Sequence, residues 1–194
     1  MTLQMPHRFA QKSTVFAAAA LLLGSAPCLT GCSDSDTGTS TEVSSAPSPD
    51  ISLDATLIAG DDNAVRNHII AGTQVNTKNM TGDTPLHIAA ALGRTYAADL
   101  LIDAGAELET KNGSGVTPLF NAAFFCHTDV LESLLEAGAN PNATDQNGSS
   151  ILQVMEMPWD QIRPIYEMVH TSIGLPFDEQ RIESARPDIA AMLR

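Results

Sequence analysis

Apolar and polar residues are arranged differently in three successive stretches of the chain. Residues 15–23 form a continuous apolar run, whereas residues 33–50 are mainly Ser, Thr, Asp, Gly and Pro, with Val43 as their one clearly apolar residue. From residue 51 onward, short apolar groups at helical spacing alternate with turns that contain Gly, Asn and Pro. Such groups predict short amphipathic helices, because apolar residues three or four positions apart share one helix face. The pattern therefore predicts a targeting segment, a linker and an all-α domain.

The N-terminal apolar run has the length and the flanks of a secretory signal. Arg8 and Lys12 precede the run, and no acidic residue occurs before Cys32. A membrane-spanning helix needs about 20 apolar residues, roughly twice this length, whereas the apolar region of a signal peptide is this short. The alternative interpretation is a short membrane anchor or a core helix.

The signal ends in the sequence Leu-Thr-Gly-Cys, which closes at Cys32 and resembles the bacterial lipobox. In that motif the cysteine thiol is attached to a diacylglycerol, and small residues before it admit the chain to the peptidase. We therefore expect cleavage of residues 1–31 and lipidation of Cys32, which anchors the protein because two or three acyl chains hold a membrane stably. Ser33 rather than Asp follows the cysteine, which favours an outer-membrane site facing the periplasm if the host is a Gram-negative bacterium that sorts by this position.

Residues 32–50 comprise this cysteine and the polar linker. The linker contains too little apolar surface to offset the entropy of ordering it, so we expect it to be disordered. A chain of this composition spans on the order of 5–6 Å × √n, a few tens of ångströms. It is therefore expected to act as a spacer between the lipid and the domain.

The all-α region contains a repeated pattern. Residues 82–90 read Gly-Asp-Thr-Pro-Leu-His-Ile-Ala-Ala and residues 115–123 read Gly-Val-Thr-Pro-Leu-Phe-Asn-Ala-Ala, so that Thr117 follows Thr84 by 33 residues. This resembles the ankyrin repeat, whose period is about 33 and whose signature is Thr-Pro-Leu-His-x-Ala. The resemblance implies helix-turn-helix units with projecting β-turns, stacked into an all-α solenoid because one unit cannot bury its own faces.

Extending this register outward divides the ankyrin-repeat domain, residues 51–194, into further units. The first unit is degenerate, and Pro158 and Pro164 interrupt the fourth. Residues 186–193 resemble residues 127–134, and we expect a closing helical pair at the C-terminus. Atypical end units are expected because each end faces water. The expected boundaries are 51–82, 83–115, 116–148, 149–175 and, for the closing helices, 176–194.

Few residues are candidates for catalysis or metal binding. His87 is the histidine of the repeat signature, and the resemblance implies that it bonds locally and connects turns. Histidines at 68, 87, 127 and 170 lack the close spacing of metal ligands, so neither a metal nor another cofactor is expected. Cys126 is the only thiol that remains in a processed, lipidated chain. A thiol-based redox or enzymatic function of Cys126 is the alternative to a binding function.

The resemblance also implies a partner-binding surface on the concave side, formed by turn tips and the ends of the first helices. Four of the apolar residues there, Phe124, Phe125, Met157 and Trp159, are expected to form one exposed patch of the kind that marks interaction sites. The alternative is that Phe125 and Trp159 fill a gap left by irregular packing. The full set of candidate partner-binding residues is Met80, Leu92, Val116, Phe124, Phe125, Met157 and Trp159.

Charge narrows the class of partner. The chain has 10 basic and 23 acidic residues, a net charge of −13, and Arg8 and Lys12 would be lost with the signal. Such a charge repels phosphate backbones, so we expect no nucleic acid, and it favours a basic protein partner. The sequence predicts a membrane-anchored, non-enzymatic adaptor, inhibitor, immunity or protective protein of the bacterial cell envelope. A structural lipoprotein bound to the cell wall is a further alternative.

Overall fold

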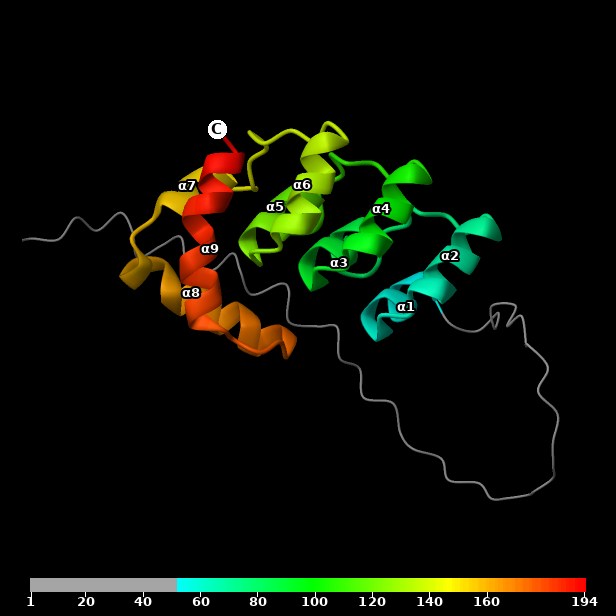
Figure 1. Cartoon of the computed structure of the whole chain (residues 1–194), viewed down its shortest axis with the longest axis horizontal. Coiled ribbons are helices and arrows are strands. Elements are labelled where there is room, and N and C mark those ends of the chain that lie inside the picture. The colour runs from blue at the N-terminus through cyan, green and yellow to red at the C-terminus, as the bar shows by residue number, and fades with distance from the viewer. Residues whose placement is uncertain (1–51) are drawn as a thin grey trace, which may run out of the picture.

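The computed structural model describes residues 52–194, and the predicted signal, Cys32 and the linker lie outside these residues. The described chain forms two rows of short helices that stack side by side into a curved solenoid (Figure 1). One isolated bridge, between Thr144 and Ser150, accompanies the helices. None of the helices in residues 52–194 is long and apolar enough to cross a membrane.

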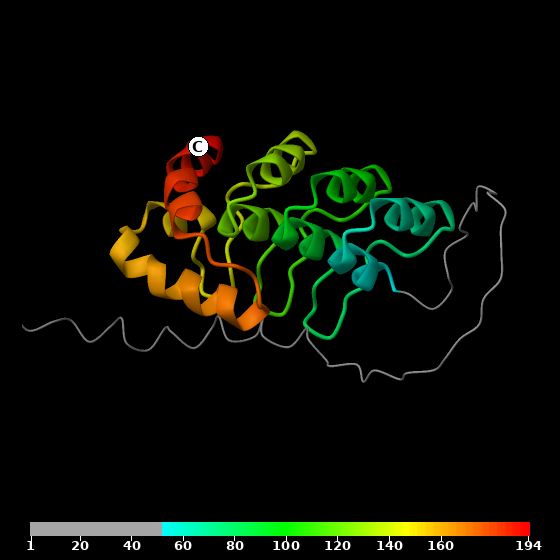
Figure 2. The same ribbon diagram turned by 60° about the horizontal axis from the view of Figure 1, so that its bottom comes forward.

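Each unit pairs an inner helix with an outer helix. The inner helices pack against one another in order along the solenoid, and the outer helices form a second row behind them (Figure 2). The expected all-α solenoid is confirmed. The three complete units are α1 (Leu53–Ala59) with α2 (Asp62–Ile70), α3 (Pro85–Leu92) with α4 (Thr95–Asp103), and α5 (Pro118–Phe124) with α6 (Thr128–Glu136).

The repeated Thr-Pro pair starts the inner helices. Thr117 is the N-cap of α5, and its hydroxyl accepts a hydrogen bond from the Phe120 backbone N–H. Pro118 follows at the first helical position, where a missing N–H costs nothing. In the fourth inner helix, α7 (Ile151–Glu156), Ser150 takes the capping position and accepts from the Gln153 N–H. The sequence substitutions in this unit therefore preserve its first helix.

A left-handed residue ends each of the first three inner helices, at positions 60, 93 and 126. Gly60 and Gly93 have φ values of 75° and 66°, and a Cβ atom at Gly93 would lie 2.5 Å from Nδ1 of His127. Glycine is required there because the next unit packs directly over the turn. Cys126 has the same conformation, with φ 57°, although it is not glycine. At this turn the neighbour is Ile182, which follows the insertion in the fourth unit, and its carbonyl oxygen lies 3.8 Å from Sγ of Cys126. The Cys126 side chain therefore has room where Gly93 has none.

The C-terminal part differs from the expected arrangement. The prediction of a closing helical pair at residues 176–194 is wrong, because a single helix, α9 (Glu179–Met192), follows a loop there. The unit expected at 149–175 is also wrong, since α9 and not α8 (Trp159–Ile173) packs against α7 as its outer helix. Arg186 follows His127 by 59 residues, which is one period of 33 plus 26 inserted residues.

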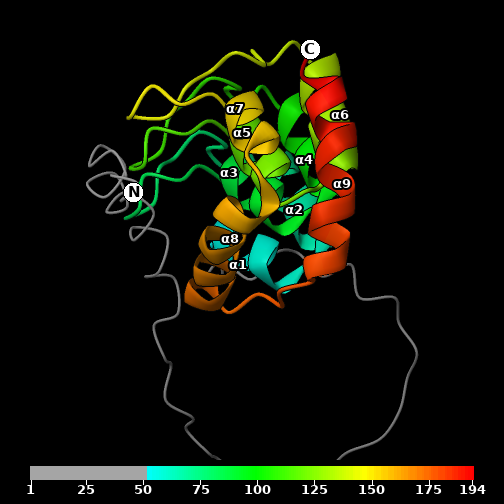
Figure 3. The ribbon, with the colours of Figure 1, turned by 90° about the vertical axis from the view of Figure 1, so that its left-hand side faces the viewer.

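Burial confirms this alignment of α9 with the outer helices. Ile189, Ala190 and Leu193 are buried, as are Val130, Leu131 and Leu134 at the corresponding positions of α6. The physical cause of the insertion lies at its start, where Met157 is extended and Pro158 cannot continue α7. Helix α8 consequently leaves the stack and runs beneath the row of inner helices (Figures 2 and 3).

Candidate protein-binding groove

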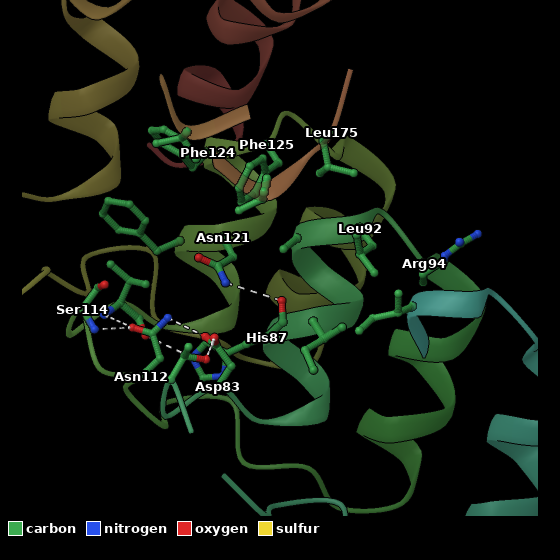
Figure 4. A pocket seen from close by; sticks show the side chains of 18 residues that line it. Asp83, His87, Leu92, Arg94, Asn112, Ser114, Asn121, Phe124, Phe125 and Leu175 are labelled. Atoms are coloured by element: carbon green, nitrogen blue, oxygen red, sulfur yellow. Dashed lines mark hydrogen bonds between the residues drawn. The ribbon is translucent and has the colours of Figure 1, made fainter. Parts of the chain in front are cut away.

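A groove lies on the concave side, between the inner helices and the end of α8. Its volume is about 320 Å³. Its lining includes Leu92 of α3, Phe124 of α5, Ile173 of α8 and the following Leu175. Asp83 lies among the turns at one end, away from Leu175 (Figure 4). The inserted helix thus adds apolar residues to the concave surface and narrows it to a slot.

Helix α8 is held on the inner helices by aromatic packing. The Tyr166 ring is stacked on the Phe124 ring with centroids 4.6 Å apart, and Phe125 meets the His170 ring edge-on at 5.6 Å. Phe124 and Phe125 are only 3% and 6% exposed. The expected exposed patch is therefore wrong for these two residues, because an inserted helix that the repeat register does not reveal covers them.

Trp159 and Met157 are partly buried at the start of the insertion. The Trp159 ring lies 5.9 Å from the Tyr166 ring and 5.5 Å from the Arg186 guanidinium carbon, and its Nε1–H donates to Oε1 of Glu179 at 3.3 Å. Trp159 therefore packs inside the C-terminal part and does not extend the concave surface. Phe125 and Trp159 thus both pack inside the described domain, and the alternative in which they fill a gap stays a prediction.

The other candidate residues have different environments. Met80 is fully exposed at a turn tip, Leu92 is partly buried in the groove, and Val116 is buried but contributes to its lining. Partner contact by all seven candidate residues stays a prediction. The sequence analysis missed Ile173 and Leu175, because no repeat pattern places an inserted segment beside the groove.

Hydrogen bonds between successive turns hold the polar rim in place. Oδ1 of Asn112 accepts from the backbone N–H groups of Ser114 and Val116, and Nδ2 of Asn112 donates to Oδ1 of Asp83 at 2.6 Å. Between residues 33 positions apart, Nζ of Lys78 donates to the Lys111 carbonyl at 2.8 Å. The turns are thus cross-linked from unit to unit, which presents a rim ordered before any partner binds.

His87 connects two units as a neutral side chain. Its Nδ1 accepts from the Thr84 N–H at 3.2 Å, and its Nε2 lies 3.0 Å from the Val116 carbonyl oxygen, which can only accept. Nε2 therefore carries the proton and Nδ1 carries none. Burial lowers the pKa of His87, because a charged ring would be desolvated. Both bonds are consistent with the expected structural role of His87, which is to connect turns.

We expect the domain to be less stable at pH 5.5 than at pH 7.5. Burial lowers the pKa values of His87, His127 and His170 below the ordinary 6.5, so below that pH the unfolded chain takes up protons that the folded chain does not. The free energy of unfolding therefore decreases as the pH is lowered, by up to about 1.4 kcal/mol for each histidine at pH 5.5. Urea denaturation at the two pH values measures this loss. Replacing His127 with Gln, which can still donate to the Ala91 carbonyl, should reduce it, and equal stability of the wild-type chain at both values would contradict the prediction.

Cys126 does not have the properties of a reactive thiol. Its side chain is buried, and desolvation raises its pKa to about 11 in spite of the opposing charge of Arg181. Little thiolate exists at neutral pH under these conditions, and the thiolate is the nucleophilic form. The redox or enzymatic alternative based on Cys126 therefore lacks its chemical basis. Within residues 52–194, no group of three or more His, Cys, Asp or Glu side chains is arranged to hold a metal ion.

Paired helices joined by projecting turns define this part of the chain as an α-helical repeat solenoid. Residues 53–145 match the family model of ankyrin repeats in three copies, so the three complete units are ankyrin repeats. The match ends before α7, and the unit with the insertion lies outside it. No match was found among curated proteins. Ankyrin repeats indicate a protein–protein interaction module, and this interpretation agrees with the groove.

Proposed function

We propose that this protein is a non-enzymatic lipoprotein of the bacterial cell envelope that binds another protein through the concave side of its ankyrin repeats. Its role is that of an adaptor, an inhibitor or immunity protein, or a protective protein. The observation that carries the binding function is the groove of about 320 Å³ between the inner helices and α8. Its apolar walls and its hydrogen-bonded rim combine the two features that interfaces require, an apolar centre and a polar border.

The anchoring part of the proposal depends on the sequence. The apolar run of residues 15–23 is followed by the lipobox-like sequence at Cys32, and 18 polar-rich residues then precede residue 51. Lipidation at Cys32 would hold the domain at a membrane while the linker gives it reach. The residue after the cysteine, Ser33, favours the outer membrane facing the periplasm in a Gram-negative host.

Site-specific photo-crosslinking tests the binding function. A photoreactive amino acid is placed at Leu92 in the groove and, in a matched variant, at Glu132, an exposed position of the outer helix α6. The full chain is then irradiated in its native membrane. We expect a discrete protein adduct from position 92 that position 132 does not form. Identical adduct patterns from both positions would contradict binding at the groove.

Metabolic labelling with an alkyne fatty acid tests the anchor. Cys32→Ser is expected to abolish labelling and to release the protein from the membrane fraction, because the thiol that accepts the lipid is lost. Cys28→Ser, four residues earlier, removes a thiol within the predicted signal and is expected to retain both labelling and membrane attachment. Loss of label from both variants, or from neither, would contradict lipidation at Cys32.

A further inference from the structure

The slot formed by α8 has a size that limits its occupant. Its volume of about 320 Å³ is at the low end of ligand pockets, which measure about 300–1,000 Å³. An α-helix with side chains is about 10–12 Å across, so this space accepts individual side chains and not a packed helix. Leu92 of α3 and Ile173 of α8 both line the slot, and both are apolar and only partly buried. An apolar side chain of an extended segment therefore matches this part of the slot.

A negative charge lies at the turn end of the same slot. Asp83 lines the slot, and its carboxylate accepts hydrogen bonds from Nδ2 of Asn112 and Oγ1 of Thr81. Two salt bridges occur in the described part of the chain, Arg163 with Glu179 and Arg194 with Glu156, and neither involves Asp83. Within residues 52–194, the carboxylate is thus positioned by neutral donors and forms no salt bridge.

A second carboxylate adds to this negative potential. Burial and the neighbouring charge of Asp83 raise the pKa of Asp54, against the effect of a hydrogen bond with Asn79. The surrounding domain has the same sign, since residues 52–194 contain 19 acidic and 8 basic side chains, a net charge of −11. Charge complementarity therefore favours a cation at the turn end, next to the apolar centre.

We propose that the slot binds an extended basic segment of the protein partner, with an apolar side chain between Leu92 and Ile173 and a Lys or Arg side chain at Asp83. This inference depends on the proposed function and specifies the chemistry of the partner. Helix α8 makes the selection possible, because without it the apolar centre would be one wall of an open surface. In an extended segment, side chains two positions apart point to the same side, so a basic residue and an apolar residue at this spacing both face the slot.

Fluorescence anisotropy with labelled seven-residue peptides tests the proposal on the purified full chain. The probe, the Lys/Leu peptide, is made of Ser with Lys at its second and sixth positions and Leu at its fourth, so that Lys and Leu face the same side. In two matched peptides, Glu replaces each Lys (Glu/Leu) or Ser replaces Leu (Lys/Ser). We expect the Lys/Leu peptide to bind at least about tenfold more tightly than either control, with binding that weakens as salt is added. Equal binding of the Lys/Leu and Lys/Ser peptides would overturn the apolar part of the proposal. If the unlabelled Lys/Leu peptide does not displace the labelled one, binding is not specific and the assignment of the slot is overturned.

Matched variants locate the binding on the protein. Asp83→Asn retains an acceptor for Asn112 and is expected to weaken Lys/Leu binding about tenfold, whereas Asp103→Asn, the same charge change at the exposed end of α4, is expected to change it less than twofold. Ile173→Ala is expected to weaken binding, unlike Ile70→Ala at an exposed position of α2. Equal effects of the two Asp variants would show a general charge effect and would overturn the assignment.

Competition and crosslinking separate this proposal from the proposed function. Tighter binding of dodecanoate than of the Lys/Leu peptide would assign the slot to an acyl chain. A dimer of the chain that the peptide dissociates would assign it to a second copy, and either result overturns the proposal. If photo-crosslinking at Leu92 captures a partner that contacts the groove through a segment without basic residues, the binding function holds and the basic-segment proposal fails. If crosslinking finds no partner while the peptide binds as expected, the proposed function fails, and only the preference of the slot for a basic, apolar segment stands.

Discussion

Replacing Tyr166 with Ala is expected to lower the free energy of unfolding by about 4 kcal/mol, the range for truncation of a buried aromatic side chain. Tyr166 is completely buried, and its ring is stacked on Phe124 at 4.6 Å. It is the central contact of α8 with the inner helices, so the loss is expected to expose Phe124 and Phe125. Urea denaturation measures the stability, and amide hydrogen exchange of α5 and α8 measures the exposure.

Tyr166→Phe is the matched control for that prediction. The hydroxyl is buried beside Cys126 and Arg186 without a hydrogen bond of ordinary geometry. Removing a buried polar group that lacks a partner is expected to leave stability unchanged or to raise it by about 1 kcal/mol. A large loss in Tyr166→Phe would show that the hydroxyl, and not the ring, stabilises the docking of α8. A loss below 1 kcal/mol in Tyr166→Ala would show that α8 is not held by this contact.

Arg186→Ala is expected to destabilise the protein by about 3 kcal/mol, through the unpaired carbonyl groups that it leaves behind. Nη2 of Arg186 lies within 2.9 Å of three carbonyl oxygens at the end of α7, those of Val154, Met155 and Met157. The Val154 carbonyl also accepts from the Met157 N–H at 3.3 Å, whereas the Met155 and Met157 carbonyls lie beyond the last hydrogen bond of α7. Arg186 is buried, so water cannot easily replace it. Chemical denaturation measures the loss, and limited proteolysis between residues 157 and 178 is expected to quicken.

Two variants test whether position, rather than positive charge, is responsible. Arg181→Ala removes an arginine that caps α5 by donating to the Cys126 and Phe125 carbonyls from an exposed position. Its cost is expected to be about 1 kcal/mol, since Arg181 is itself exposed and its two bonds are only partly buried. Arg186→Lys keeps the charge but loses the planar donor group and is expected to recover less than half of the stability. Equal losses for Arg181→Ala and Arg186→Ala would contradict this account.

The complete units were predictable because their determinants are local. Thr117 and Pro118 favour a helix start, and glycine at position 93 favours a left-handed turn, wherever they occur in a chain. The period of 33 then implies stacking, because each unit has apolar faces that only its neighbours can cover. Such local preferences are visible in a single sequence and were confirmed in the structure.

The fourth unit was not predictable in this way. Residues 186–193 resemble residues 127–134, but the similarity alone does not show that residues 158–178 leave the stack and that α9 completes the unit begun by α7. That outcome depends on contacts between residues far apart in the chain, such as Arg186 with the end of α7 and Tyr166 with Phe124. The prediction that Phe124 belongs to an exposed patch was wrong for the same reason, because α8, which begins more than 30 residues later in the chain, covers this side chain.

The sequence by itself determined the elements whose causes lie within one repeat: the starts and ends of helices, the turns, their stacking, and the acidic charge that limits the class of partner. It also carries the prediction of lipidation at Cys32. The tertiary structure alone decided where α8 lies, and with it the burial of Phe124 and the presence of Ile173 in the same groove as Leu92. The physical reason is that a repeat pattern specifies contacts between equivalent positions, whereas an inserted helix is placed by side-chain packing that no periodicity encodes.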